Sequence, residues 1–351
     1  MTHEFIEIIE SYRIAKQQGI PAVMVTVVDV EGSSYRRAGV RMLILQNNKM
    51  IGAVSGGCVE KEALRQSQSV FKTGAPKIMT YDGKYRLGCE GVLFMLIEPF
   101  KISDQVIETI QQHFRSRKPF ILQSYYSKKL KEYNQMGSVI QLSDNQEFSF
   151  SKETNLDESL DCFINEMKPS FRLIIIGAEH DAVKLCQLAS LSGWEVTVVG
   201  SSKDPKKLED FPGAYQIINT SPEEIVIDNI DEQTAIILMS HNFAKDLLYL
   251  QAIKDEKPVY IGLLGPAKRR EKLLNAFIDY FPDVDDVFLD SIHGPAGLNL
   301  GAETPQEIAI SILAEILSVI RSQKPIPLQE KKGAIHDDPK RKNINVISTN
   351  I

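Results

Sequence analysis

The stretch FRLIIIGAEHDAVKLCQLASLSGWEVTVVG, residues 171–200, decides the fold of the second half of the chain. Short apolar runs within it predict buried strands, and the segment between two of them has the spacing of an amphipathic helix. The same alternation continues downstream. The expected elements are strand 172–176, helix 182–192, strands 195–199 and 235–239, helix 245–254 and strand 259–261. Strands that alternate with helices indicate a Rossmann-like, doubly wound parallel sheet, which we expect over residues 171–328.

The first turn of this unit, GAEHDA at residues 177–182, departs from the dinucleotide-binding fingerprint. Glu179 stands where a second glycine would let the backbone approach a pyrophosphate, and its carboxylate would repel that group. Gly200 ends the next strand, where an Asp or Glu would bind the ribose. We therefore expect the affinity for NAD or NADP to be weak or absent.

The first half of the chain predicts an α+β domain over residues 1–150, so the expected fold class is α/β with an amino-terminal α+β domain before the Rossmann-like sheet. Its elements are helix 4–18, strands 22–30, 41–46 and 50–54, a helix from about 58 to 74, and strands 77–81 and 92–98. Residues 101–150 extend this domain with helix 102–118 and strands 120–126 and 138–142. Residues 151–170 are expected to form a linker with a short helix at 160–167, and the polar residues 329–351 a mobile tail.

Composition excludes several classes of protein. The 351 residues carry 40 Lys plus Arg against 46 Asp plus Glu, a net charge of −6, which offers no footprint for a nucleic acid. The start has neither the basic flank nor the apolar run of a signal peptide, and no run approaches the ~20 residues that span a bilayer, so we expect a cytoplasmic protein without a membrane partner. The four cysteines are dispersed and form no CxxC pair, so they are interpreted as thiols rather than disulfide or metal ligands.

Two glycine turns of the first domain each carry a cysteine. Ser55, Gly56 and Gly57 precede Cys58 at a predicted helix start, and Cys89 lies in the turn GCEG at 88–91. Backbone amides at such a helix start point toward an anion and stabilise a thiolate, so Cys58 is the candidate reactive thiol. The alternative is that Cys58 is a small buried side chain in a tight turn.

The loop EGSSYRRAGVRM, residues 31–42, is a candidate oxyanion site. Ser33, Ser34, Arg36 and Arg41 offer hydroxyls and guanidinium groups, which match the oxygens of a phosphate. The alternative is that the arginines are merely solvated.

Three residues of the second domain are candidates for ligand contacts. His241 and His293 follow predicted strands, at the carboxyl edge of the sheet where such folds bind ligands, and Glu303 precedes the last helix. The alternative is that each histidine makes only local hydrogen bonds. Thr304 and Glu307 are explained by a capping box that begins this helix.

Several motifs together resemble the XdhC/CoxI family of maturation factors for xanthine dehydrogenase-type enzymes. The motifs are VVDVEGSSYRRAGVRMLI at 27–44, GAVSGGCVE at 52–60, LGCEGVLFMLIEP at 87–99, the pair SHNFAKD at 240–246 and IGLLGPAKRR at 261–270, and HGPAGLNLGAETPQEIAISILAEI at 293–316. The resemblance covers roughly residues 5–100 and 170–322, in the family's order.

The resemblance implies a chaperone that binds molybdenum cofactor transiently, supports its sulfuration and inserts it into a molybdenum hydroxylase. It also implies that Cys58 meets the cofactor, that Cys89 is the family's second cysteine, that a cysteine desulfurase is a further partner, and that the protein forms a homodimer. Catalytic turnover is not indicated. Two alternatives stay open: an NAD(P)-dependent oxidoreductase that uses the Rossmann-like domain, and a structural docking subunit of the hydroxylase.

Overall fold

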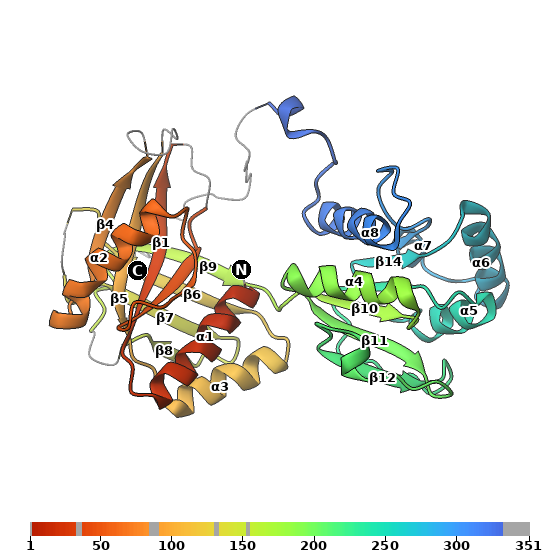
Figure 1. Ribbon diagram of the computed structural model, residues 1–351, viewed down its shortest axis with the longest axis horizontal. Coiled ribbons are helices and arrows are strands. Elements are labelled where there is room, and N and C mark those ends of the chain that lie inside the picture. Colours follow the sequence, from red (N-terminus) through yellow and green to blue (C-terminus); the bar gives the residue numbers. More distant parts are fainter. Residues whose placement is uncertain (1, 33–36, 84–90, 130–132, 152–154, 333–351) are drawn as a thin grey trace, which may run out of the picture.

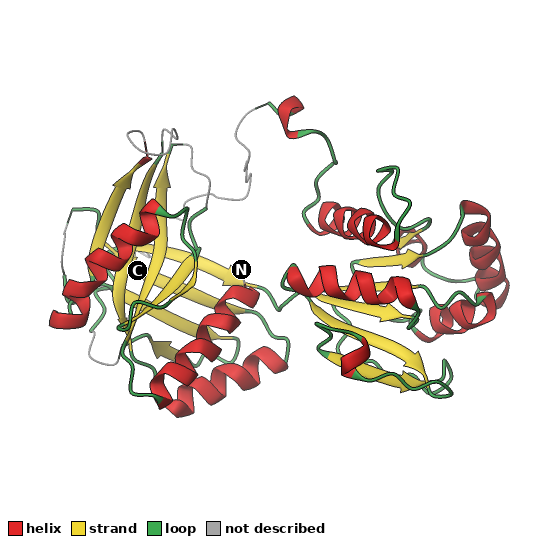
Figure 2. Cartoon of the chain, in the orientation of Figure 1, coloured by secondary structure: helices red, strands yellow, loops and turns green. Residues whose placement is uncertain are grey.

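The computed structural model describes residues 2–32, 37–83, 91–129, 133–151 and 155–332, which form two parts side by side (Figure 1). In the first part, helices and two sheets are packed together, and in the second part helices cover both faces of one sheet (Figure 2). The expected α+β part followed by a parallel Rossmann-like sheet is therefore confirmed.

The first part is built on a five-stranded antiparallel sheet with the order β3-β2-β1-β5-β4. Its strands are β1 (Ala22–Glu31), β2 (Arg41–Leu45), β3 (Met50–Gly52), β4 (Lys77–Asp82) and β5 (Val92–Phe100). Helix α2 (Cys58–Thr73) covers one face and helix α1 (Thr2–Gln17) packs against the other. Both faces of the central strands are thus buried, which explains their nearly continuous apolar sequences.

A second, four-stranded sheet with the order β8-β7-β6-β9 completes the first part. Its elements are α3 (Asp104–Arg115), β6 (Phe120–Tyr126), β7 (Gly137–Leu142), β8 (Glu147–Ser149) and β9 (Asp161–Met167). Phe5, Phe100, Phe120 and Phe150 meet in one aromatic cluster, which joins α1 and the first sheet to this second sheet.

The prediction of a short helix at residues 160–167 is wrong. The segment is strand β9, which pairs antiparallel with β6 from Met167 opposite Phe120 to Asp161 opposite Tyr126. Its buried residues near the end, Asn165 and Met167, alternate with exposed ones, which is the period of a strand. The segment expected to be a linker therefore contributes a strand to the first part.

The second part is a six-stranded parallel sheet with the order β12-β11-β10-β13-β14-β15. Its strands are β10 (Arg172–Ile176), β11 (Glu195–Ser201), β12 (Gln216–Thr220), β13 (Thr234–Leu238), β14 (Tyr260–Leu263) and β15 (Ile292–His293). Helices α4 (His180–Leu191) and α8 (Pro305–Ile320) pack on one face, while α5 (Phe243–Ala252), α6 (Ala267–Tyr280) and α7 (Asp286–Asp290) pack on the other. No helix of the described ranges is long and apolar enough to cross a membrane.

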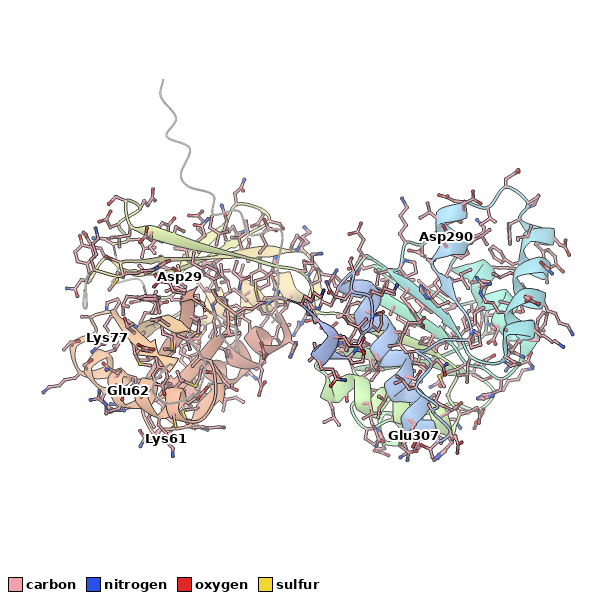
Figure 3. The ribbon with its side chains drawn as sticks, turned by 90° about the horizontal axis from the view of Figure 1, so that it is seen from above. Asp29, Lys61, Glu62, Lys77, Asp290 and Glu307 are labelled. Carbon is pink, nitrogen blue, oxygen red and sulfur yellow. The ribbon has the colours of Figure 1, made fainter. Side chains whose placement is uncertain are left out.

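The predicted capping box at the start of α8 is confirmed. The Thr304 hydroxyl accepts a hydrogen bond from the Glu307 amide at 3.3 Å, and the Glu307 carboxylate accepts one from the Thr304 amide at 2.9 Å. Pro305 occupies the first helical position. Figure 3 shows Glu307 on this helix and Asp290 at the other side of the second part.

The two parts meet at the amino ends of the parallel strands. Arg117, which follows α3, contacts Ser170 before β10, Glu195 at the start of β11 and Asp231 before β13. The carboxyl ends of these strands therefore face away from the first part, as the direction of β11 shows in Figure 1. Beside this contact lies a groove of about 630 Å³ lined by Phe120, Met167 and Asp231, among others.

Candidate functional site

The exposed turn Ser55 to Cys58 opens helix α2, as expected. Cys58 is the first helical residue and Gly57 is the N-cap. Glu60 holds the turn, because its Oε1 accepts hydrogen bonds from the amides of Val54 at 3.1 Å and Ser55 at 2.7 Å. The glycines thus sit on an anchored backbone at a helix amino terminus, where partial positive charge gathers.

The thiol of Cys58 is exposed, so burial in the core does not explain it. A Cβ added at Gly56 or Gly57 would meet no atom of the described residues within 4 Å. Lys61 and Glu62 follow on the same helix at the surface (Figure 3). This arrangement offers a ligand a soft sulfur atom beside accessible backbone amides.

The carboxylate of Glu60 was not foreseen from the sequence. It is 8% exposed, and its Oε2 has no hydrogen-bond partner among the described residues. A Glu in the first turn of a helix is a recognisable signal, because it can accept backbone hydrogen bonds of the preceding turn.

The loop before β2 is described only in part. Ser33, Ser34 and Arg36 lie outside the described residues, as does Cys89. The end of β1, just before the loop, is fixed by Lys128, whose ammonium group lies 2.6 Å from both Asp29 and Glu31. These two hydrogen-bonded carboxylates raise the pKa of Lys128.

Arg41 lies at the start of β2 and is buried between the two sheets, at 6% exposure. Its Nη1 donates to the carbonyl oxygen of Gly39 at 3.0 Å. Burial lowers the pKa of its guanidinium to about 10. This inward position argues against the expected role of Arg41 as a surface ligand for a phosphate.

At the carboxyl edge of the second part, His241 and Asp181 form a bridge. His241 follows β13 and lies 2.9 Å from Asp181, measured from Nε2 to Oδ2, and Asp181 is in the first turn of α4 after β10. The chain leaves β10 and β13 toward opposite edges of the sheet, so the bridge spans the switch point where such folds bind ligands. His241 also adopts a left-handed φ of 55°, an uncommon conformation outside glycine.

Two glycines near this turn have no room for a side chain. Gly177 has a φ of 126°, and a Cβ there would lie 2.3 Å from the carbonyl oxygen of Met239, so the backbones are in close contact. Next to Gly200 lies the side chain of Asn219, whose Oδ1 would be 2.8 Å from an added Cβ. The Asn219 amide accepts a hydrogen bond from the Lys206 amide at 2.9 Å and donates one to the Lys206 carbonyl oxygen at 2.8 Å, so its side chain is fixed beside Gly200.

His293 belongs to a separate cluster with Tyr260 and Glu315. Its ring stacks on Tyr260 with centroids 4.4 Å apart, and its Nδ1 lies 3.3 Å from Glu315 Oε1. Glu315 Oε2 accepts hydrogen bonds from the Tyr260 hydroxyl at 2.5 Å and the Gly297 amide at 2.7 Å. Burial opposes ionisation of Glu315, but hydrogen bonds from His293, Tyr260 and Gly297 leave its pKa lowered.

Those sequence-predicted residues that the structure describes are not brought into one site within the chain. Cys58 belongs to the first part, while His241 and His293 lie at the carboxyl edge that faces away from it. The two histidines are also separated, since β14 lies between their strands. Glu303 is exposed, and its amide donates to Glu307 at 2.9 Å, which extends the cap of α8.

These features define a class of protein: an amino-terminal α+β domain with an exposed cysteine turn, followed by a Rossmann-like parallel-sheet domain. Residues 15–82 match the model of the XdhC and CoxI family, and residues 173–316 match the model of the XdhC Rossmann domain. Together the two matches cover more than half of the chain. The chain belongs to the XdhC and CoxI family.

Named relatives and a solved structure agree with this assignment. The chain is 29% identical to a probable xanthine dehydrogenase subunit from Bacillus subtilis, over 84% of this chain and 92% of the relative. It is 25% identical to the molybdenum cofactor insertion chaperone PaoD from Escherichia coli, over 87% and 85%. A crystal structure described as a xanthine dehydrogenase from Bacillus halodurans is 27% identical and superposes with a TM-score of 0.75, over 90% of this chain and 96% of that chain.

Proposed function

We propose that the protein is a molybdenum cofactor-binding chaperone, which supports the sulfuration of the cofactor and its insertion into a xanthine dehydrogenase-type molybdenum hydroxylase. The observation that carries the proposal is the exposed Cys58 thiol on an anchored, open glycine turn at a helix amino terminus. The family membership and the name of the relative PaoD support it.

The chemistry of the turn suits this cargo. A thiolate is a good ligand for a soft or sulfur-bearing metal centre, and helix-terminal amides attract anionic groups. No described residue would contact a side chain at Gly56 or Gly57 within 4 Å, so among these residues nothing blocks the approach of a ligand to the backbone. Binding by one thiol and a few amides is compatible with release to a client, because neither encloses the cargo.

Ser33, Ser34, Arg36 and Cys89 remain proposed contacts of the cofactor. Their placement is outside the described residues, so the proposal for them rests on the family resemblance alone. His241, His293 and Glu303 could contact the same cargo only across a second copy of the chain, because the carboxyl edge faces away from Cys58.

The partners in this proposal are the hydroxylase, a cysteine desulfurase and a second copy of the chain. Light scattering tests the homodimer directly: at micromolar concentration we expect about twice the chain mass of 39.4 kDa. A monomer mass would rule out the homodimer.

Cofactor transfer tests the proposed function. The protein is purified from cells that make the cofactor, and mixed with a cofactor-free xanthine dehydrogenase-type hydroxylase. We expect the loaded protein to activate the hydroxylase more than an equal amount of free cofactor does. Activation that is independent of the protein, with no pterin or molybdenum bound to it, would contradict the proposal and leave only a structural docking role.

A further inference from the structure

A band of buried polar side chains lies between the two sheets of the first part. Arg41 on β2 and Thr26 on β1 are directly opposite each other in the strand pairing, and Glu98 lies on the other neighbour of β1. Arg41, Thr26 and Glu98 are 6%, 0% and 2% exposed. Ser138 of the second sheet also contributes to this band.

Two of the three guanidinium nitrogens of Arg41 have no hydrogen-bond partner among the described residues. Its Nη1 is used by Gly39, but Nε and Nη2 are buried without a partner among the described residues, and so is the Thr26 hydroxyl. The guanidinium carbon of Arg41 lies over the Phe5 ring, 6.0 Å from the ring centroid. This is a cation–π contact and not a hydrogen bond. Buried donors of a charged group are rarely left unsatisfied, because their lost hydration is costly.

Glu98 does not satisfy these donors. Its two carboxylate oxygens accept hydrogen bonds from the amide and the hydroxyl of Ser138, at 2.8 and 2.5 Å. Within the described part of the chain Glu98 and Arg41 make no ion pair at 4.0 Å or less, although at longer range the charge of Glu98 raises the pKa of Arg41 and that of Arg41 lowers the pKa of Glu98. Burial raises the pKa of Glu98 to about 7, so this carboxyl offers only a partial countercharge near neutral pH.

The unpaired atoms Nε and Nη2 form the edge of the guanidinium group that can donate to two oxygens of one ligand at the same time. Arg117 uses the same edge in this molecule, with Nε and Nη2 at 3.0 and 2.9 Å from the two carboxylate oxygens of Asp231. An oxyanion is the ligand that matches such a fork in both charge and geometry, and the Thr26 hydroxyl supplies a third donor.

We propose that Arg41 and Thr26 hold a small oxyanion, of the size of nitrate or hydrogen carbonate, between the two sheets. The anion would sit close to Gly39, whose carbonyl oxygen accepts a hydrogen bond from Arg41 Nη1. Its binding would stabilise the start of β2 at Arg41. The proposal does not depend on the binding of molybdenum cofactor.

The test compares thermal unfolding of the full chain in sodium nitrate and in sodium chloride at equal ionic strength. The variants are Arg41→Lys, which keeps the charge but loses the fork, and Thr26→Val, which loses the hydroxyl at nearly constant shape. Arg13→Lys is the control, because Arg13 is an exposed arginine that pairs with Glu10. Any general effect of nitrate on the unfolding midpoint should therefore appear in Arg13→Lys as it does in the parent.

We expect the nitrate-minus-chloride shift of the unfolding midpoint to be about 2–4 °C larger in the parent and in Arg13→Lys than in Arg41→Lys, with Thr26→Val in between. Crystals grown in nitrate should show a planar three-oxygen group against Nε and Nη2. Equal shifts in the parent and Thr26→Val would overturn the proposal, and so would a crystal with water only at the fork. Should Arg41→Lys fail to fold, Thr26→Val and the crystal still decide.

Discussion

Arg117 holds the carboxylate of Asp231 with two hydrogen bonds, from Nε to Oδ2 at 3.0 Å and from Nη2 to Oδ1 at 2.9 Å. The two residues are 114 positions apart and belong to the two different parts of the molecule. Arg117 is 8% exposed and adopts a left-handed φ of 53°, so the backbone is held in an uncommon conformation at this contact. The pair fixes the amino ends of the parallel strands against the first part.

We expect Arg117→Lys to lower the free energy of unfolding by about 1–3 kcal/mol, because an ammonium group cannot reproduce the two parallel hydrogen bonds of the buried guanidinium to the partly buried carboxylate of Asp231. Urea unfolding followed by circular dichroism measures the change, and limited proteolysis should show faster cleavage between the two parts. Arg115→Lys, two residues earlier and exposed, is the control. Equal stability of the two variants would mean that the Arg117–Asp231 pair contributes nothing to the free energy of unfolding.

Glu98 predicts a specific pH dependence of stability. Burial raises its pKa in the folded protein to about 7 from the ordinary value of 4.5. The folded state therefore binds the proton more tightly, so this contribution is complete below about pH 4.5 and is lost as the pH rises through about 7. The loss amounts to up to about 3 kcal/mol.

The variant Glu98→Gln isolates this effect, because an amide does not titrate, its oxygen can still accept from the Ser138 amide, and its NH2 group can donate to the Ser138 hydroxyl. Chemical unfolding between pH 5 and 8 should show a flatter pH profile for Glu98→Gln than for the parent, while the exposed Glu108→Gln should follow the parent. Parallel profiles of Glu98→Gln and the parent would contradict the assignment.

Glu60 should control the shape of the cysteine turn. Glu60→Ala leaves the buried Val54 amide without its acceptor, and we expect a loss of about 1–3 kcal/mol in stability and a changed rate of Cys58 modification by a thiol reagent. Glu62→Ala is the matched control on the same helix, since Glu62 pairs with groups of α2 such as Arg65 at the surface. An unchanged modification rate in Glu60→Ala would show that the turn is held by other contacts.

Binding of NAD or NADP should be weak, with a dissociation constant above about 0.1 mM by calorimetry. Restoring the fingerprint with Glu179→Gly and Gly200→Asp should not be sufficient, because the Asp side chain would meet Asn219. Adding Asn219→Ala should improve binding over the double variant. Micromolar binding by the parent would reverse this interpretation of the second domain.

The parallel sheet could be predicted from the sequence because its central strands are buried on both faces, so β10 and β13 are continuous apolar runs. Strand β12 was not predicted, since this edge strand is only partly buried. Strand β9 was predicted as a helix because its polar, exposed residues give a weak pattern. Its pairing with β6 is a tertiary property that no local signal carries.

The candidate site also has features that follow from local sequence patterns and features that depend on tertiary structure. The start of α2 at Cys58 follows from a local pattern of glycines before a helix, and it was predicted. The contacts between His241 and Asp181, and between Tyr260 and Glu315, join residues 60 and 55 positions apart. Such contacts depend on how the strands are ordered, so the sequence could place His241 at the sheet edge but could not give its partner.

The retention of cofactor by cysteine variants tests the central claim most directly. The parent, Cys58→Ala and Cys162→Ala are purified from cells that make molybdenum cofactor, and bound molybdenum and pterin are measured per chain. Cys162 is the matched control, because it is also an exposed thiol but lies on β9. We predict that Cys162→Ala retains as much cofactor as the parent and that Cys58→Ala, folded equally by circular dichroism, loses most of it. Equal retention by all three proteins would contradict the account.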